Sequence, residues 1–272
     1  MNDAKKPLVS VMIPYYNCEQ YIAETIASVE RQSYPNIEII IIDDGSLPAS
    51  AAFLAELLQN KPAIRFASQS NQGVAAARNH AARLAKGEYF LFLDADDQIL
   101  PDYIQKSVAV LEKKAEYKLV YSLGEVFGVQ TGTWNLPAYE GLAMLLKGNH
   151  IPAVAMHSSE DFKNVGGFDE SLKTHEDWDL WIRILSRGGE AVRIPKILFR
   201  YRKRQNSSSL TDSLTKHGMA VRQSWQKVYL KHSEIFVKHG LGYYDLICNI
   251  DTKKQKNQKN QLYKLISCFK WQ

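Results

Sequence analysis

Four short apolar runs recur along the first hundred residues, at the spacing of a strand–helix–strand repeat. They comprise residues 8–13, 37–42, 64–67 and 89–93, and each has the length of a buried strand. Between the first two runs, Ile22, Ile26 and Val29 recur at helical spacing and predict a crossover helix. Asn17 and Gln20 resemble a capping pair at the start of that helix.

Further helices are predicted at residues 73–86, 101–114, 178–185 and 215–235. Strands that alternate with helices favour an α/β fold with a mostly parallel sheet, in which ligands bind beyond the carboxyl ends of the strands. After Tyr121 the pattern weakens, because glycines and Pro137 interrupt it. This second half is expected to shape a second pocket.

Charge and cysteine content narrow the function classes. The net charge is +5, but the six lysines of residues 253–272 exceed that excess, so the rest of the chain carries about −1. A nucleic-acid-binding surface spread over the fold is therefore not expected. The three cysteines lie far apart, which indicates a reducing compartment rather than a disulfide framework. With no apolar leader at the amino terminus, we expect a cytoplasmic protein.

Polar residues follow three of the predicted strands, and their chemistry suits a nucleotide. Tyr16 can stack on a base, and Asp44 can accept an N–H of that base. Asp94, Asp96 and Asp97 suit a hard divalent ion that bridges phosphate oxygens. Taken singly, these segments are also ordinary turn sequences. Neither a Gly-x-Gly-x-x-Gly after the first strand nor a P-loop motif is present, which disfavours dinucleotide oxidoreductases and P-loop enzymes.

Several segments together resemble the inverting family 2 glycosyltransferases, which have the glycosyltransferase A fold. The resemblance covers residues 7–212 and rests on Val9-Ser10-Val11-Met12-Ile13-Pro14-Tyr15-Tyr16-Asn17, Ile42-Asp43-Asp44-Gly45-Ser46, Asn71-Gln72-Gly73, Ala77-Arg78-Asn79, Leu93-Asp94-Ala95-Asp96-Asp97, Val165-Gly166-Gly167-Phe168-Asp169-Glu170 and Glu176-Asp177-Trp178-Asp179-Leu180-Trp181. It implies an α/β, Rossmann-like nucleotide-sugar-binding sandwich. We expect a catalytic domain at residues 1–212, with a nucleotide-binding half at 1–97 and an acceptor-binding half at 98–212. A helical extension with a basic tail is expected at residues 213–272.

The resemblance also implies a donor site. Pro14, Tyr16 and Asp44 would hold the base, with Tyr16 stacking, while Arg78 would lie near the nucleotide or the donor sugar. A surface charge on a helix is the alternative for Arg78. The full set expected to bind the nucleotide sugar is Pro14, Tyr16, Asn17, Asp44, Gly73, Arg78, Asp94, Ala95 and Arg204.

By the same resemblance, Asp94 and Asp96 form an Asp-x-Asp motif that binds Mn²⁺ or Mg²⁺, with Asp96 as the direct ligand. The alternative for the neighbouring Asp97 is to cap the following helix. The ion would neutralise charge on the departing diphosphate.

The resemblance makes Asp177 the general base toward the acceptor hydroxyl, with Glu176 orienting it or binding acceptor. His175 would have a similar role, although a lone histidine is more often a surface or core residue. Acids at this position also complement a helix dipole. Trp178 and Trp181 fit the helix core better than sugar stacking.

The chain departs from the family at two places. Arg204 stands where many relatives have a histidine that binds metal or diphosphate, and guanidinium cannot ligate a cation but can bind diphosphate oxygens. A solvent-facing basic loop is the alternative. The tail at residues 253–272 combines lysines with apolar residues at helical spacing, which is compatible with an anionic membrane surface, with docking on the domain or with a second subunit.

We therefore expect a hexosyl- or N-acetylhexosaminyltransferase. It would move a sugar from a nucleotide diphosphate sugar, usually a UDP-sugar, to a hydroxyl of a saccharide or lipid-linked glycan, with inversion, in cell-surface polysaccharide biosynthesis. Two rivals are a nucleotidyltransferase and a non-catalytic sugar-nucleotide binding module. The first would want a glycine-rich phosphate loop that Tyr15, Tyr16 and Asn17 do not supply, and the second need not keep Asp177.

Overall fold

The computed structural model describes residues 6–205 and 218–242 of the chain. Its backbone divides into two compact units, Met1–Val228 and Tyr229–Gln272. The basic tail at residues 253–272, with its expected membrane contact, lies outside the described residues.

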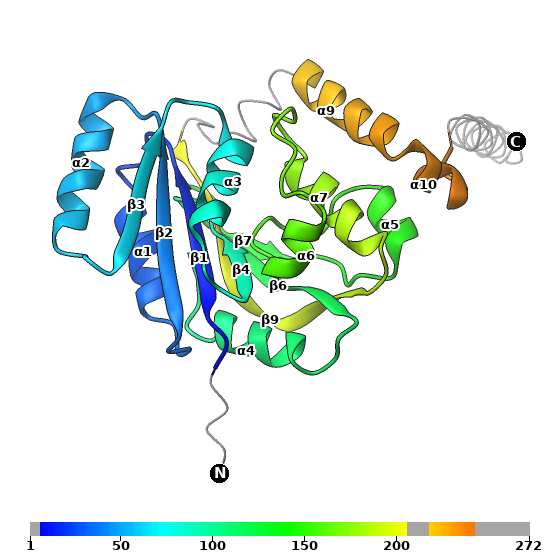
Figure 1. Cartoon of the computed structure of the whole chain (residues 1–272), viewed down its shortest axis with the longest axis horizontal. Coiled ribbons are helices and arrows are strands. Elements are labelled where there is room, and N and C mark those ends of the chain that lie inside the picture. The colour runs from blue at the N-terminus through cyan, green and yellow to red at the C-terminus, as the bar shows by residue number, and fades with distance from the viewer. Residues whose placement is uncertain (1–5, 206–217, 243–272) are drawn as a thin grey trace, which may run out of the picture. The chain divides into compact units, whose positions relative to one another are not determined.

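The centre of the first unit is a nine-stranded mixed sheet in the order β3-β2-β1-β4-β8-β6-β9-β5, with β7 paired to β6 (Figure 1). The strands are β1 (Val9–Tyr15), β2 (Ile37–Asp44), β3 (Ile64–Gln69), β4 (Tyr89–Phe92), β5 (Gln98–Ile99), β6 (Tyr117–Gly128), β7 (Gly132–Trp134), β8 (Met156–Ser158) and β9 (Glu190–Lys203).

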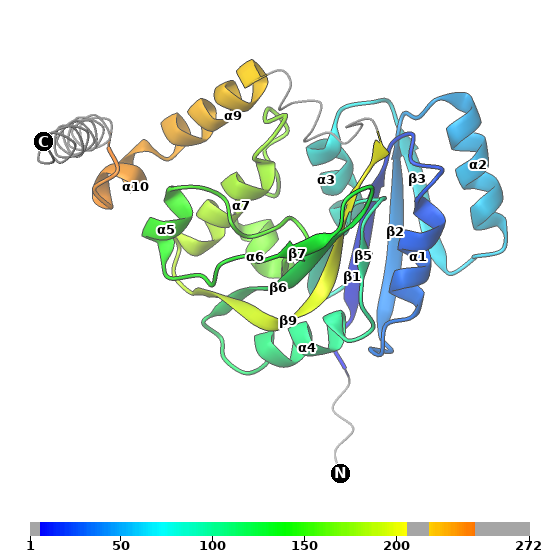
Figure 2. The same cartoon turned by 180° about the vertical axis from the view of Figure 1, so that it is seen from behind.

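Helices cover both faces of this sheet. They are α1 (Ile22–Glu30), α2 (Pro48–Gln59), α3 (Val74–Leu84), α4 (Tyr103–Leu111), α5 (Leu142–Leu146), α6 (Ser159–Asn164) and α7 (Glu176–Leu185). In Figure 1, α3, α6 and α7 lie in front of the sheet. Seen from the opposite side, α1 and the strands β6, β7 and β9 are in front (Figure 2).

The first four strands in the sheet, β3, β2, β1 and β4, are parallel, as the sequence pattern predicts. The apolar side chains of β1 and β4 and of the end of β2 are buried on both faces, which is typical of a sheet covered by helices on either side, whereas the edge strand β3 leaves Phe66 exposed. In register, Tyr15 pairs with Asp43, and Asp44 pairs with Gln69. The strands therefore end at one edge of the sheet, and the polar residues that follow them gather there.

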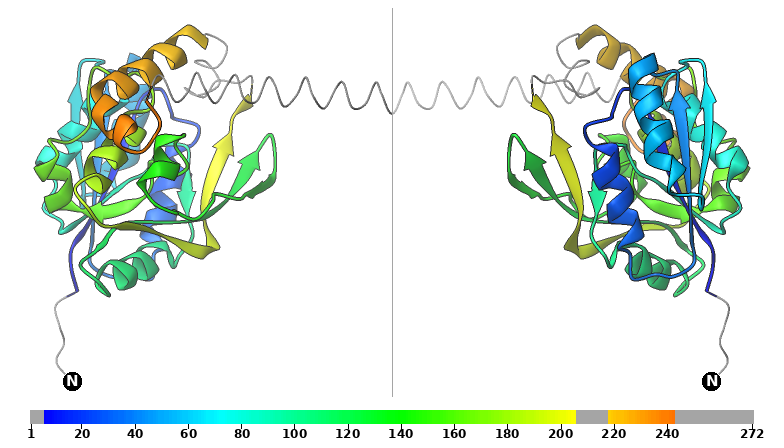
Figure 3. Two further views of the ribbon diagram at one scale, coloured as in Figure 1. Left: turned by 90° about the vertical axis from the view of Figure 1, so that its right-hand side faces the viewer. Right: turned by 90° about the vertical axis from the view of Figure 1, so that its left-hand side faces the viewer.

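The second half of the sheet is not mostly parallel, so this expectation is wrong for that half. The strand β8 runs antiparallel to both β4 and β6, and the long strands β6 and β9 pair in parallel. Figure 3 shows β6 and β7 projecting away from the plane of the first strands. The sequence pattern weakens here because these strands are only half-buried, and Gly124 and Gly128 lie inside β6 rather than in breaks between elements.

The pairing of β6 with β9 contains register irregularities. Leu123 is paired with Ile197, but Gly124 is paired with Phe199, so Leu198 is one extra residue in β9. An extra residue of this kind reverses the facing of the side chains that follow it.

Local differences from the sequence expectations have physical causes. The helix α1 begins only at Ile22, with no side-chain cap, so the predicted capping pair is wrong. Asn17 is instead in the left-handed region at φ 46°, a conformation that asparagine tolerates. The helix α2 has Pro48 in its first turn but buries only Ser50 and Leu54, so it shows little amphipathic pattern.

Two helices, α9 (Gly218–Lys231) and α10 (Ser233–Lys238), lie where the sequence predicts a helix at residues 215–235, of which the structure describes residues 218–235. Among the helices of the described residues, none has both the length and the apolar character needed to span a bilayer.

Candidate functional site

The loops that follow β1 and β2 are joined by two hydrogen bonds. The backbone N–H of Asn17 donates to Ser46 Oγ over 3.0 Å, and the N–H of Leu47 donates to Asn17 Oδ1 over 2.8 Å. The side chain of Tyr16 beside them is 51% exposed. Pro14 lies within β1, opposite Ile42 of β2. The joined loops therefore present one open aromatic ring at the edge of the sheet, as stacking on a base requires.

Asp44 is buried and organises the loop that leads into α3. Its carboxylate accepts hydrogen bonds from Gln69 Nε2 at 2.9 Å, from the N–H of Gln72 at 2.9 Å and from the N–H of Gly73 at 2.8 Å. Gly73 has φ 95°, a conformation that favours glycine. Since a carboxylate has about four acceptor positions, Asp44 retains capacity for one more donor.

Arg78 joins the two halves of the first unit through its guanidinium group. Nη2 lies 2.7 Å from Asp94 Oδ1, which follows β4, and Nη1 lies 2.6 Å from Glu176 Oε1, at the start of α7. The group also lies over the ring of Phe168, 5.3 Å from its centroid. Burial lowers the pKa of Arg78, but Asp94 and Glu176 more than offset this and raise it above its ordinary value. Arg78 is thus a buried bridge rather than a surface charge.

The loop at Gly166, Gly167 and Phe168 is bonded to α3 beside this bridge. Asn79 Nδ2 donates to the carbonyl oxygen of Phe168, and the N–H of Phe168 donates to Asn79 Oδ1, both over 2.9 Å. A Cβ on Gly167 would lie 2.7 Å from Asn79 Oδ1, so the close approach requires glycine. This loop therefore packs closely against α3 beside the Arg78 bridge.

Asp96 forms an ion pair with Arg204, just beyond the end of β9. Arg204 Nε lies 2.6 Å from Asp96 Oδ2, and its Nη2 lies 3.1 Å from Cys18 Sγ. The guanidinium also lies over the ring of Tyr21. Burial raises the pKa of Asp96, and Arg204 opposes that rise. Arg204 therefore faces the aspartate motif and not the solvent.

The turn at Asp94–Asp97 is fixed by Arg202 and Thr25. Arg202 donates its N–H to Asp97 Oδ1 and its Nε to the carbonyl oxygen of Asp96, each over 2.8 Å, while Thr25 Oγ1 donates to the carbonyl oxygen of Ala95 over 2.9 Å. Burial raises the pKa of Asp97 well above its ordinary value. The alternative role of Asp97 as a helix cap is wrong, because the residue before α4 is Asp102.

Two carboxylates at this edge have the chemistry of a divalent-ion site. Within residues 6–205 and 218–242, no group of three or more His, Cys, Asp and Glu side chains is arranged to hold a metal. Asp94 and Asp96 each engage one oxygen with an arginine, Arg78 and Arg204 respectively. Mg²⁺ is commonly bound by one or two carboxylates together with substrate phosphates. The residues present therefore fit an ion that takes its other ligands from a diphosphate and water.

Asp177 is partly buried in the first turn of α7. Its Oδ1 accepts the N–H of Trp178 over 2.7 Å, and its Oδ2 accepts Asn149 Nδ2 over 2.9 Å. Burial and the neighbouring Glu176 raise the pKa of Asp177 to about 7, while Arg78 opposes the rise. A carboxylate with such a pKa is suited to general-base work near neutral pH.

The residues around Asp177 have distinct places. Glu176 is buried and accepts a hydrogen bond from Arg78. His175 precedes α7 at φ 62°, and its Nδ1 is hydrogen-bonded to Thr174 Oγ1. Trp178 and Trp181 are fully buried, which confirms their predicted core role.

Sequence reasoning did not single out Asn149 or Gln69. Gln69 ends β3 and is polar, so the strand-end signal that marks Asp44 also applies to it. Asn149 lies in an irregular loop of the second half, where no periodic pattern marks it.

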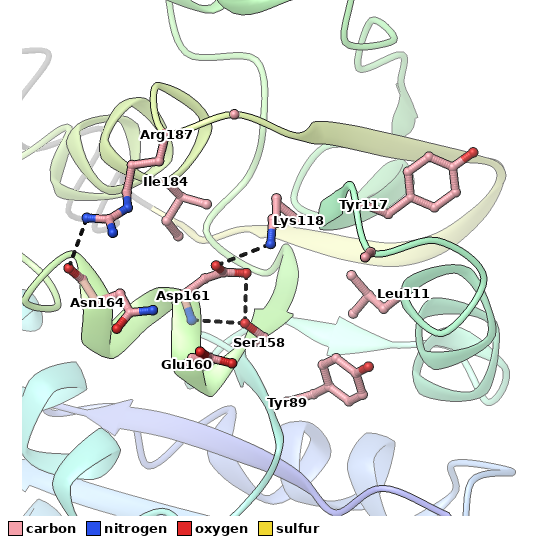
Figure 4. A pocket seen from close by; sticks show the side chains of 12 residues that line it. Tyr89, Leu111, Tyr117, Lys118, Ser158, Glu160, Asp161, Asn164, Ile184 and Arg187 are labelled. Atoms are coloured by element: carbon pink, nitrogen blue, oxygen red, sulfur yellow. Dashed lines mark hydrogen bonds and ion pairs between the residues drawn. The ribbon is translucent and has the colours of Figure 1, made fainter.

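A cavity of about 430 Å³ lies at the other end of β4 (Figure 4). It is lined by Tyr89 at the start of that strand and by Lys118 and Asp161, which lie 3.5 Å apart. None of the sequence-predicted site residues lines it.

Known proteins are similar to a large part of this chain. The family described as glycosyl transferase family 2 matches residues 10–158. The chondroitin synthase of Escherichia coli is 32% identical over 199 residues, which are 71% of this chain and 28% of that protein. EpsE of Bacillus subtilis (strain 168) is 32% identical over 213 residues, 72% of this chain and 73% of that protein. The chain thus spans less than a third of the synthase but most of EpsE.

Solved structures share the fold. S. aureus TarS 1-349 in complex with UDP-GlcNAc has a TM-score of 0.64 at 23% identity, covering 74% of this chain and 61% of that one. The mannosyltransferase PcManGT from Pyrobaculum calidifontis, in complex with GDP-Man and Mn²⁺, has a TM-score of 0.59 at 18% identity, covering 84% and 70%. These structures confirm the expected α/β, Rossmann-like glycosyltransferase A fold. Because the family model matches more than half of the chain, the chain belongs to glycosyltransferase family 2.

Proposed function

We propose that the chain is an inverting glycosyltransferase. It takes a sugar from a nucleotide diphosphate sugar, with UDP as the nucleotide, and transfers it to a hydroxyl group of a saccharide or lipid-linked glycan in polysaccharide assembly. The observation that carries this proposal is the bridge through Arg78, which links Asp94 on the donor side to Glu176, the neighbour of Asp177, at 2.7 and 2.6 Å. By binding Glu176, the bridge keeps the neighbouring Asp177, whose pKa suits a general base, beside the expected diphosphate site.

The donor is held at the edge of the sheet by groups of different chemistry. The exposed ring of Tyr16 stacks on the base, and Asp44 accepts one N–H from it. The guanidinium of Arg204 binds diphosphate oxygens, for which its planar fork is well shaped. The structures of TarS with UDP-GlcNAc and of PcManGT with GDP-Man support a nucleotide-sugar donor.

Asp94 and Asp96 would hold a divalent cation, Mn²⁺ or Mg²⁺, together with the diphosphate. When bound, such an ion neutralises charge on the leaving diphosphate. The complex of PcManGT with Mn²⁺ supports this assignment. Arg204 already compensates the charge of Asp96 from within the protein.

Transfer then proceeds in one displacement. The carboxylate of Asp177 removes the proton of the acceptor hydroxyl, whose oxygen forms a bond to the anomeric carbon from the face opposite the diphosphate. The bond from that carbon to the diphosphate oxygen breaks, and its electron pair leaves with the diphosphate. The configuration of the sugar is thereby inverted.

The deciding experiment compares wild type with Asp177→Asn. A panel of nucleotide sugars is screened for release of nucleotide diphosphate in the presence of saccharide acceptors, with and without Mn²⁺, and donor binding is measured by calorimetry. Asp177→Asn should lose transfer but keep donor affinity. Binding without turnover in both proteins would instead identify a sugar-nucleotide binding module.

A further inference from the structure

We propose that Asn149 is a positioning residue for Asp177: its side-chain amide fixes the orientation of the carboxylate and stabilises the ionised form. The inference rests on the proposed function, in which Asp177 removes the acceptor proton. Asn149 lies in the loop between α5 and β8, far from Asp177 in sequence, and none of the family motifs includes it.

The orientation of the Asn149 amide is determined by its two partners. Oδ1 accepts the backbone N–H of Ile151 over 3.1 Å, and Nδ2 donates to Asp177 Oδ2 over 2.9 Å. A flipped amide would place oxygen against the carboxylate and nitrogen against an N–H, so both hydrogen bonds would be lost. Asn149 therefore presents a donor to Asp177, and a donor favours the carboxylate over the carboxylic acid.

The loop that carries Asn149 is attached on both sides to the helix that carries Asp177. Trp178 Nε1 donates to the carbonyl oxygen of Leu145 over 2.8 Å, and Trp181 Nε1 donates to that of Ile151 over 3.1 Å. Both indoles are fully buried in α7. The positions of the amide and the carboxylate are thus set by one helix, as a positioning contact requires.

Other groups around Asp177 act on its ionisation in both directions, so the loss of the Asn149 donor should change its pKa. Glu176 and the burial of the site oppose ionisation of Asp177, whereas Arg78 of α3 and the N–H of Trp178 favour it. Beyond Arg78 lies Asp94, which shares that guanidinium with Glu176. His175 precedes α7 and bonds to Thr174. Since Asn149 is itself exposed, its replacement removes the donor without opening a buried cavity.

The inference is tested with Asn149→Ala and Asn149→Asp. NMR titration of ¹³C-labelled aspartate carboxyls, with the Asp177 signal assigned by its absence in Asp177→Asn, gives the pKa directly. Loss of one hydrogen bond to a charged group should raise that pKa by about one unit in Asn149→Ala. In Asn149→Asp a second carboxylate faces the first, so the shift should be larger. Transfer at pH 6 should fall about tenfold in Asn149→Ala and recover at high pH.

The control is Lys147→Ala, which removes another exposed side chain of the same loop and should leave the titration and the turnover unchanged. An Asp177 titration in Asn149→Ala that superimposes on wild type overturns the inference. So does a raised KM for acceptor with an unshifted titration, because that result identifies an acceptor contact. The titration needs no turnover, so this outcome is separate from that of Asp177→Asn, on which the proposed function depends.

Discussion

Arg78 Nη1 donates a hydrogen bond to Glu176 Oε1 over 2.6 Å, although the two residues lie 98 positions apart in the chain. The bond connects α3, beside the expected donor site, to the first turn of α7. Within the described residues, Arg78 Nε is buried without a hydrogen-bond partner, so the group is held by its two ion pairs and by the ring of Phe168. Stability and chemistry therefore both depend on this one side chain.

Replacing Arg78 by alanine should lower the free energy of unfolding by about 3 kcal/mol, because Glu176 then stays buried without its counter-charge. Arg78→Lys keeps the charge but lacks the planar fork, so it should lose part of that stability as well. Urea unfolding measures both. The matched control is Lys61→Ala, which removes an exposed ion pair with Glu30 and should cost less than about 1 kcal/mol. Equal losses in Arg78→Ala and Lys61→Ala would contradict the bridge.

Transfer should depend on pH through Asp177. Burial, followed by Glu176, raises the pKa of this acid to about 7, and only the ionised form accepts a proton. Below that value kcat/KM should fall about tenfold per pH unit. Linkage gives the opposite sign for stability: folded Asp177 holds its proton more tightly than the unfolded chain does. Ionisation of Asp177 therefore lowers the free energy of unfolding as the pH rises from 3.8 to about 7.

The pH profile is measured between pH 5 and 9, with donor and acceptor varied separately. Asp177→Asn should show a low and flat profile. A wild-type profile that stays flat down to pH 5, as the ordinary aspartate pKa of 3.8 would give, would contradict the raised pKa.

Tyr16→Ala should weaken nucleotide binding without changing the melting temperature. Stacking of a base on an aromatic ring is worth about 1–3 kcal/mol, which corresponds to a rise in Kd of about 5- to 150-fold. The side chain is 51% exposed, so the fold loses little with it. Calorimetric titration with UDP measures the affinity. Tyr16→Phe should bind as wild type does, and Leu47→Ala, at an exposed position of the neighbouring loop, is the control.

Arg204 should reduce the dependence of diphosphate binding on metal. Its guanidinium already lies 2.6 Å from Asp96, so part of the positive charge at the site belongs to the protein. We expect wild type to retain measurable UDP affinity in chelator, and Arg204→Ala to lose at least about tenfold, as expected for a hydrogen bond between charged groups. Arg204→His should restore binding only with Mn²⁺. If chelator abolishes binding and transfer as completely in wild type as in Arg204→His, the idea fails.

The first half of the fold could be predicted from the sequence because its central strands, β1, β2 and β4, are largely buried on both faces. Such strands are continuous apolar runs, and the carboxyl ends of parallel strands must meet at one edge. Tyr16, Asp44 and Asp94 are therefore expected close together from the sequence alone. The sequence does not predict that the Asp44 carboxylate already accepts hydrogen bonds from Gln69, Gln72 and Gly73.

The second half could not be predicted in the same way. Strands β6 and β9 are half-buried and irregular, and their pairing depends on contacts distant in sequence. The contacts of Asn149 are equally hidden, because its position beside Asp177 depends on a loop bonded to Trp178 and Trp181 and not on any local pattern.

The extra residue Leu198 in β9 determines which face of that strand the following side chains present. Since side chains alternate along a strand, Arg200 and Arg202 share one face, and both guanidinium groups lie over the ring of Phe127. Arg202 and Arg204, which lies just beyond the strand, both bond to Asp96. Deleting Leu198 would turn these arginine side chains to the opposite face of β9 and would bring Tyr201 and Lys203 to the face that the arginines now occupy. The positive charge beside Asp96 thus depends on the register of one strand, and a one-residue change in β9 would alter the electrostatic surface of the proposed diphosphate site.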